Sequence, residues 1–182
     1  GLSNNGSMRT RCNPNGHAPM CKWHEIVTYF PPIENVASVC ITSVLGHLMS
    51  TDFVGKTSFD HPIELFTANV KKVVEKTTQD LGIIHNLVDC AHGISGDDDY
   101  ESVPSATYLY LWLDCDREGE NICTEIVNVL PSIKHEHIYR AKFSALSSTD
   151  VRKAWSKPRK INLFQSNAVD VRQELDLKIG CA

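Results

Sequence analysis

The chain has 182 residues, of which 42% are hydrophobic, enough to form one globular domain with its own core. Its seven cysteines are odd in number and include no CxxC pair, which argues against a secreted disulfide scaffold and for a soluble intracellular protein. No uncharged apolar run approaches the roughly 18 residues that a membrane-spanning helix needs, so we expect no membrane partner.

The formal charge of −4 is divided unevenly along the chain. Residues 1–130 carry 8 Lys and Arg against 17 Asp and Glu, a net charge of −9, whereas residues 131–182 carry 10 against 5, a net charge of +5. Basic side chains of the second part are suited to contacting the phosphates of a polyanion. They include Lys153, Lys157, Arg159 and Lys160. A solvated helix face explains the same composition, so the charge pattern leaves both interpretations open.

The first half of the chain predicts a loop, a hairpin and a helix. Residues 1–22 are rich in Asn, Gly, Pro and Ser and lack periodicity, which predicts a loop-rich segment. Two strand-like runs, residues 25–30 and 36–43, flank Pro31 and Pro32 and predict a hairpin. Apolar residues at helical spacing predict a helix over residues 78–91.

The second half predicts alternating strands and helices. The aromatic and apolar run 108–113 predicts a buried strand, and the spacing of Ile122, Ile126 and Leu130 predicts a helix over residues 117–130. Further elements are expected as a strand at 137–143, a helix at 151–157 after an N-cap region at 147–150, and a helix at 166–182 with Val169, Leu175 and Ile179 facing inward. This order predicts an α/β fold.

Four carboxylates lie within seven residues at the junction between the strand at 108–113 and the helix that follows. They are Asp114, Asp116, Glu118 and Glu120. Acids that repel one another at the carboxyl end of a strand need a cation to hold them together, and Mg²⁺ prefers oxygen ligands. The alternative is that Asp114 caps the helix instead of binding a metal.

Two weaker metal sites also deserve mention. The run Asp97 to Asp99 is acidic but lacks the spacing and the terminal Glu of a calcium-binding EF-hand loop. A zinc site is conceivable from four residues near the start of the chain, although their spacing matches no usual ligand pattern. These residues are Cys12, His17, Cys21 and His24.

The residues 111–123, Leu-Trp-Leu-Asp-Cys-Asp-Arg-Glu-Gly-Glu-Asn-Ile-Cys, resemble the metal-binding motif of the TOPRIM domain in type IA DNA topoisomerases, particularly the eukaryotic topoisomerase III group. Three further segments resemble this family in order and spacing: residues 42–49, 139–144 and 168–180. The wording of residues 111–116 and 179–182 is more similar to the beta-type enzymes, with the alpha-type as the alternative.

The resemblance implies roles for particular residues. Asp114, Asp116 and Glu118 would hold Mg²⁺ beside the cleaved phosphodiester. The residues expected to contact DNA are Arg117, His47, Arg140 and Arg172, of which the last three would also act in catalysis together with Asp176, which would orient Arg172 one helical turn away. For His47 a satisfied loop histidine is the alternative, and for the two catalytic arginines it is a surface salt bridge.

The resemblance also implies an incomplete TOPRIM domain. In the family an opening strand carries a glutamate and a lysine, which we expect to precede this chain, and no tyrosine here lies in a nucleophile motif. We therefore expect a Rossmann-like TOPRIM domain that lacks its first strand, over residues 23–160, after a loop-rich segment at 1–22. Residues 161–182 would be the first helix of the next domain.

The expected function is that of a segment of a type IA topoisomerase. Such an enzyme cleaves and religates one strand through a 5′-phosphotyrosyl link without ATP, relaxing negative supercoils and resolving junctions. The segment alone should be inactive. The resemblance implies a nuclear protein, with the cytoplasm as a further location, that acts on single-stranded DNA or RNA with an OB-fold or Tudor-type accessory protein. The alternatives are a non-catalytic metal-binding product, and another TOPRIM enzyme such as a primase or nuclease.

Overall fold

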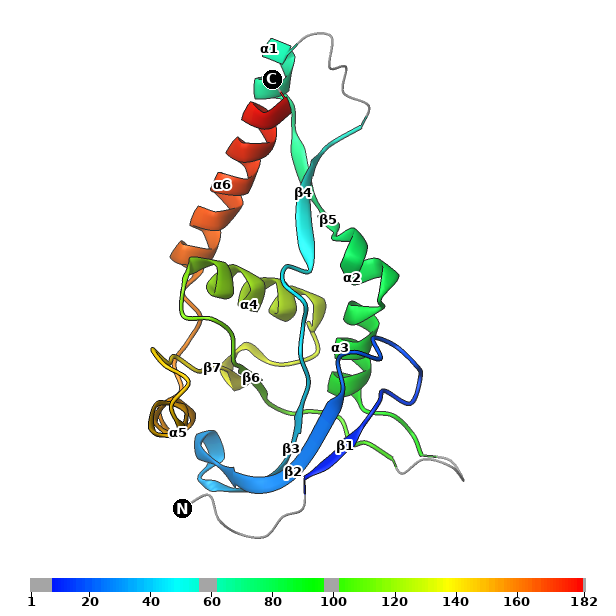
Figure 1. The fold of residues 1–182 in the computed structure, drawn as a ribbon, viewed down its shortest axis with the longest axis vertical. Helices are drawn as coiled ribbons and strands as arrows, with labels where there is room; N and C mark the ends of the chain where they lie inside the picture. Colours follow the sequence, from blue (N-terminus) through cyan, green and yellow to red (C-terminus); the bar gives the residue numbers. More distant parts are fainter. Residues whose placement is uncertain (1–7, 56–61, 97–101, 182) are drawn as a thin grey trace.

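A computed structural model describes residues 8–55, 62–96 and 102–181. Its strands are β1 (Arg9–Arg11), β2 (Trp23–Phe30), β3 (Asn35–Ile41), β4 (Met49–Phe53), β5 (Val70–Val74), β6 (Leu109–Leu111) and β7 (Ile138–Arg140). Its α-helices are α1 (Pro62–Thr67), α2 (Lys76–Asp80), α3 (Ile83–His92), α4 (Arg117–Val129), α5 (Ser148–Ser156) and α6 (Leu163–Cys181). Figure 1 shows α4 crossing the middle of the molecule, between α6 and the pair α2 and α3. Asp97 to Asp99 lie outside the described residues.

Strands β6 and β7 are parallel and are connected through α4. Leu109 lies opposite Ile138, and Leu111 lies opposite Arg140. Because parallel neighbours need a crossover, this strand–helix–strand arrangement is the unit of Rossmann-like folds, and the predicted α/β class is confirmed. Both strands are shorter than the runs 108–113 and 137–143 predicted from the sequence.

The predicted hairpin forms an antiparallel sheet in the order β1-β2-β3. β2 and β3 pair from His24–Ile41 to Phe30–Asn35, which confirms the turn expected at the two prolines. The interpretation of residues 1–22 as loop alone was wrong for Arg9–Arg11, which pair with the start of β2. A three-residue strand has too little periodicity to be recognised and depends on its partner strand.

The helix predicted over residues 78–91 is two helices, α2 and α3. Gly82 separates them with a φ of 67°, a left-handed conformation that glycine adopts without steric cost. The apolar spacing continues across this break, with Ile83 and Leu87 buried in the main core. Periodicity alone therefore missed the interruption.

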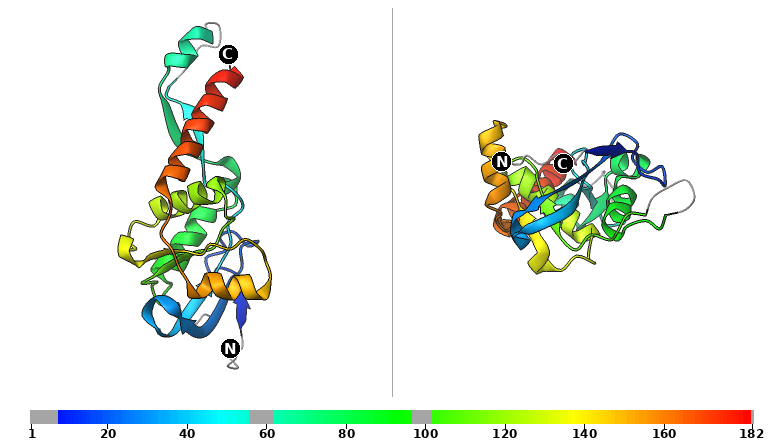
Figure 2. Two further views of the ribbon diagram at one scale, coloured as in Figure 1. Left: turned by 90° about the vertical axis from the view of Figure 1, so that its left-hand side faces the viewer. Right: turned by 90° about the horizontal axis from the view of Figure 1, so that it is seen from below.

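Helix α6 and the antiparallel pair β4–β5 form an arm that extends from the body of the molecule (Figures 1 and 2). Lys72 on β5 ties the arm to α6 through Asp170, at 2.7 Å, and Gln173, at 2.6 Å. Val169 is buried as predicted, but Leu175 and Ile179 are 52% and 63% exposed, so their predicted inward position was wrong. No helix within the described residues is long and apolar enough to cross a membrane.

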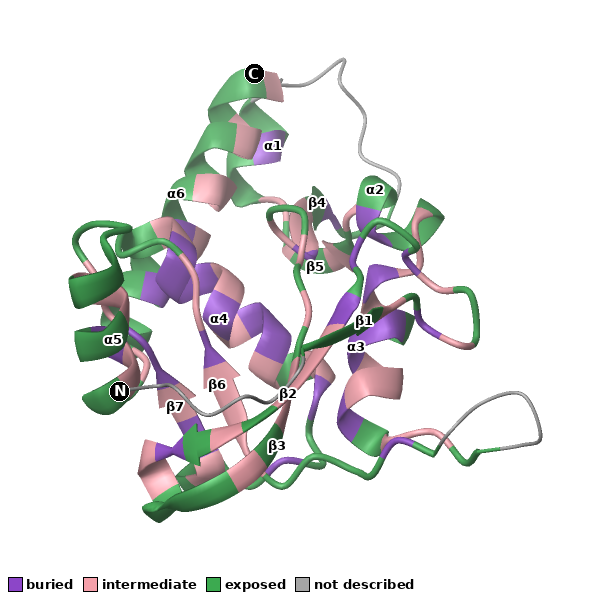
Figure 3. Cartoon of the chain, turned by 60° about the horizontal axis from the view of Figure 1, so that its bottom comes forward, coloured by how far each residue is buried: buried purple, intermediate pink, exposed green. Residues whose placement is uncertain are grey.

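The main core lies between α3, α4 and the β6–β7 sheet, where buried residues concentrate in Figure 3. The loop before β2 is fastened to α3 by polar contacts to Asp89. His17 donates to Asp89 across 2.9 Å, as does the side-chain amide of Asn13. Burial alone would raise the pKa of Asp89, but these hydrogen bonds lower it below its ordinary value of 3.8.

Asp89→Asn is expected to lower the free energy of unfolding by about 1–2 kcal/mol at pH 7, because the charge-assisted bond to His17 is lost. A carboxyl with a depressed pKa stabilises the fold above its ordinary pKa and loses that contribution as the pH falls through the folded-state value. The difference between variant and parent should therefore shrink below about pH 3.8. Urea midpoints at pH 7 and pH 3 measure it, with exposed Asp80→Asn as the control.

Candidate functional site

The acidic residues predicted as a metal site form the turn between β6 and α4, here called the acidic turn (residues 112–118). Asp116 is the N-cap of α4, and its Oδ1 accepts a hydrogen bond of 2.7 Å from the backbone N–H of Gly119. The capping role considered for Asp114 therefore belongs to Asp116. The side chains of Asp114, Asp116 and Arg117 are exposed.

Arg140 lies beneath the acidic turn and is completely buried. Its guanidinium donates to the carbonyl oxygens of Leu113, Asp114 and Ala141 at 2.8, 2.5 and 2.7 Å. Nε donates to Glu120 across 3.1 Å. This geometry fixes the position of the turn and does not offer the guanidinium to DNA, in contrast to the contact expected from the sequence.

Glu120 is the buried anion that balances Arg140. Its carboxylate also accepts from Lys142, at 2.9 Å, and from the backbone N–H of Asn162, at 2.7 Å. Burial opposes its ionisation, but these donors and the two cations lower its pKa. The residue thereby links β7 and the segment that leads into α6 to the first turn of α4.

Glu118 is the point where His47 and Arg172 meet. Its Oε2 lies 3.2 Å from Nε2 of His47 and 3.2 Å from Nη2 of Arg172. Arg172 also lies 3.8 Å from Asp176 one turn along α6. The structure thus brings together four residues selected from the sequence, but it holds Glu118 in an ion-pair network on the side of α4.

His47 bridges two carboxylates. Its Nδ1 lies 3.3 Å from Glu125, which is buried and also accepts the backbone N–H of Leu48 at 2.8 Å. The hydrogen bond to Glu125 raises the pKa of His47 above its ordinary value, helped by Glu118 and opposed by burial. Both ring nitrogens can donate only in the imidazolium form, so this setting favours a charged His47.

Comparison with known families decides the assignment of this strand–turn–helix site. A family model described as the Toprim domain matches residues 32–146. This chain belongs to the Toprim domain family. The match includes the acidic turn, His47, Arg140 and the β6–α4–β7 unit, and it lies within the residues 23–160 expected from the sequence.

The chain is also similar to curated topoisomerases. It is 38% identical over 191 residues to DNA topoisomerase 3-beta of Drosophila melanogaster, a match that covers 100% of this chain and 19% of that protein. It is 34% identical over 186 residues to DNA topoisomerase 3-alpha of Arabidopsis thaliana, covering 100% and 18%. It is 37% identical over 151 residues to DNA topoisomerase 3-beta-1 of Mus musculus, covering 78% and 16%.

These matches confirm the resemblance to the topoisomerase III group. The chain spans less than a fifth of the length of these relatives. Relatives of both types occur at similar identity, so the preference for the beta-type stays a prediction.

The Toprim site has the donor chemistry for Mg²⁺ but not a convergent three-carboxylate arrangement. Asp114 and Asp116 present exposed carboxylate oxygens, whereas Glu118 is engaged by His47 and Arg172. Within residues 8–55, 62–96 and 102–181, no three His, Cys, Asp or Glu side chains are grouped to hold a metal. The two aspartates still fit Mg²⁺, because this ion is often held by one or two carboxylates plus water and phosphate.

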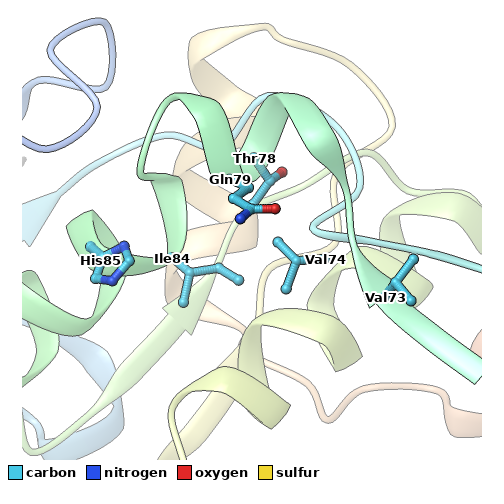
Figure 4. Close-up of a pocket in the computed structure, with 6 residues that line it drawn as sticks. All are labelled: Val73, Val74, Thr78, Gln79, Ile84 and His85. Atoms are coloured by element: carbon cyan, nitrogen blue, oxygen red, sulfur yellow. The ribbon is translucent and has the colours of Figure 1, made fainter.

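Two shallow hollows mark the surface of this Toprim chain. The larger, about 540 Å³, lies between β5, α2 and α3, and Figure 4 shows its mainly apolar lining. None of the residues predicted from the sequence lines it. The smaller, about 470 Å³, is formed by Asp116 and Arg117 of the acidic turn and by three residues of α6: Phe164, Gln165 and Ala168. Its acidic and basic groups make the smaller hollow the better candidate for a metal-bound phosphate.

Sequence reasoning missed three residues that support the Toprim site. Glu120 and Lys142 neutralise and anchor Arg140, and Glu125 holds His47. Glu125 has the one local signal, since it is an acid in a helix whose neighbours Cys123 and Ile126 are apolar and buried. The partners of all three lie 20 or more residues away along the chain, where no local pattern reveals them.

Proposed function

We propose that this chain is the Toprim part of a type IA DNA topoisomerase. The whole protein would cleave one strand through a 5′-phosphotyrosyl link and religate it without ATP, relaxing negative supercoils and resolving DNA junctions. The nucleophilic tyrosine would come from a part of the protein outside these 182 residues. The observation that carries the proposal is the acidic turn, which joins a parallel strand to a capped helix and lies beside Arg117 and α6.

In this proposal Mg²⁺ is held by Asp114 and Asp116, with Glu118 joining them on release from its ion pairs. The ion would supply charge stabilisation at a phosphate and favour religation. Arg140 and Glu120 act as positioning residues, because they are buried and fix the backbone on which the aspartates stand.

Basic residues around the acidic turn would hold the DNA strand. Arg117 is exposed at the start of α4, where the helix dipole also favours an anion. The side chain of Arg172 is 51% exposed and is oriented by Asp176. A charged His47 behind Glu118 would limit the repulsion between that carboxylate and a phosphate.

The wider setting follows the topoisomerase proposal. The substrate would be single-stranded DNA, with RNA as an alternative, and an OB-fold or Tudor-type protein would be the accessory partner. The protein would work in the nucleus, with the cytoplasm as a further location. Residues 23–160 would form the Toprim domain, and α6, within residues 161–182, would begin the next domain.

Asp116→Asn tests the proposal because it separates metal binding from capping. Asparagine caps a helix as well as aspartate does, so the bond to Gly119 is retained while one charge is removed. We expect Mg²⁺-dependent relaxation of negatively supercoiled DNA by the whole protein to be lost. Binding of Mn²⁺ to this chain, measured by electron paramagnetic resonance, should weaken by at least tenfold, about 1.4 kcal/mol.

The matched control is Asp150→Asn, which changes an aspartate in the first turn of α5. It should leave relaxation and Mn²⁺ binding unchanged. Full activity and metal affinity in Asp116→Asn would contradict the metal assignment. Loss of both with a lowered thermal midpoint would instead indicate that the cap had failed.

A further inference from the structure

Helix α5 has a packed inner side that contacts the β6–β7 sheet. Ala154 is buried, and the hydroxyl of Tyr110 donates to the carbonyl oxygens of Ala154 and Trp155, both at 2.9 Å. The ring of Trp155 lies 4.9 Å from that of Tyr110. Ser147 caps the helix by accepting from the backbone N–H of Asp150. These contacts fix which side of α5 faces solvent.

The outer side of α5 carries three exposed cations, Arg152, Lys153 and Lys157. None of the three forms an ion pair within the described part of the chain, and the nearby Asp150 is occupied by Ser147. Lys160 is different, because its ammonium donates to three backbone carbonyls, including that of Ile138 at 3.0 Å. The outer side therefore concentrates positive charge that the fold itself does not use.

Aromatic residues connect this basic side to the acidic turn. The rings of Trp155 and Trp112 are stacked, with centroids 6.2 Å apart and an interplanar angle of 24°. Phe143 lies 5.9 Å from Trp112, and its backbone N–H donates to Sγ of Cys115 in the acidic turn. Trp112 and Phe143 are each partly exposed. Cations beside partly exposed aromatic rings are typical of surfaces that bind single-stranded nucleic acid.

We propose that Arg152, Lys153 and Lys157 bind the phosphates of the single strand that passes the acidic turn. This inference rests on the proposed function and adds a contact surface outside the metal site. The helix would extend the basic path begun by Arg117, with Trp112 and Phe143 between the two.

The make-up of α5 favours a nucleic acid over a lipid surface. A helix that binds a membrane interface exposes large apolar side chains beside its cations. The solvent side of α5 instead combines its cations with the small hydroxyl residues Ser148, Thr149 and Ser156. Phosphate contacts of this kind are made mainly by Arg and Lys and carry no sequence preference.

The test uses the complete 182-residue chain with a fluorescein-labelled 20-nucleotide oligothymidylate, whose binding is followed by anisotropy between 50 and 300 mM KCl. The variant is the triple change Arg152→Gln, Lys153→Gln and Lys157→Gln. Each single-strand phosphate contact contributes about 0.7 to the salt slope, so the slope should fall by about 2. Affinity at 0.1 M KCl should fall by roughly 100-fold on the same basis.

The control removes three exposed lysines elsewhere, through Lys22→Gln, Lys71→Gln and Lys76→Gln. It produces the same change of net charge and should alter the slope by less than about 0.5. An α5 variant with the parental salt slope would overturn this inference while the proposed function stands. If the parent chain bound no oligothymidylate, both would be overturned. Thermal midpoints within about 2 °C of the parent would show that the variants are folded.

Discussion

Arg140→Met is expected to lower the free energy of unfolding by about 3–5 kcal/mol, the usual cost of leaving a buried charge without its partner. The side chain is fully buried, and its removal leaves Glu120 with Lys142 as its remaining cation. The carbonyl oxygens of Leu113 and Asp114 would lose their donor as well. Because whole domains are stable by only about 5–15 kcal/mol, the loss should be plain in urea denaturation.

Arg172→Met is the control for the loss of an arginine paired with a glutamate. The side chain of Arg172 is 51% exposed, so its ion pair to Glu118 should contribute less than about 1 kcal/mol. A double variant, Arg140→Met with Glu120→Leu, should lose less than the sum of the single changes, since neither charge is then stranded. A loss below about 1 kcal/mol in Arg140→Met would contradict the buried role and return the residue to the DNA-contacting group.

Local patterns predicted the central unit of the fold correctly. The aromatic strand followed by acidic residues and an amphipathic helix became β6, the acidic turn and α4, because strand propensity, capping and helical spacing act over a few residues. Ser147 caps α5 for the same reason. The predicted hairpin also formed around its two prolines.

The features that were missed depend on contacts between distant residues. Arg140 resembles a surface cation in sequence, and only the fold places Glu120 against it. The exposed positions of Leu175 and Ile179 show the opposite case, since helical spacing indicates an apolar face without showing what covers it. Two of the three predicted metal ligands are exposed together, whereas Glu118 is drawn aside by His47 and Arg172.

Gly119→Ala is expected to displace the acidic turn and weaken Mn²⁺ binding by more than tenfold. A Cβ at Gly119 would overlap the carbonyl oxygen of Asp114 and lie 2.9 Å from its carbonyl carbon, and both are backbone atoms that cannot rotate away. It would also lie 3.3 Å from Nη2 of Arg140. Overpacking of this kind costs about 1–3 kcal/mol, so the urea midpoint should fall together with the metal affinity.

Gly180→Ala is the matched control, because a Cβ there meets nothing within 4 Å. Alanine is the better helix former, so this variant should be unchanged or more stable by less than about 1 kcal/mol. If Gly119→Ala kept parental metal affinity, the position of the Asp114 backbone would not matter for binding. If it lost affinity while Asp116→Asn also lost it with an intact cap, the two results together would show that Mg²⁺ needs both the charge of Asp116 and the backbone geometry that Gly119 permits.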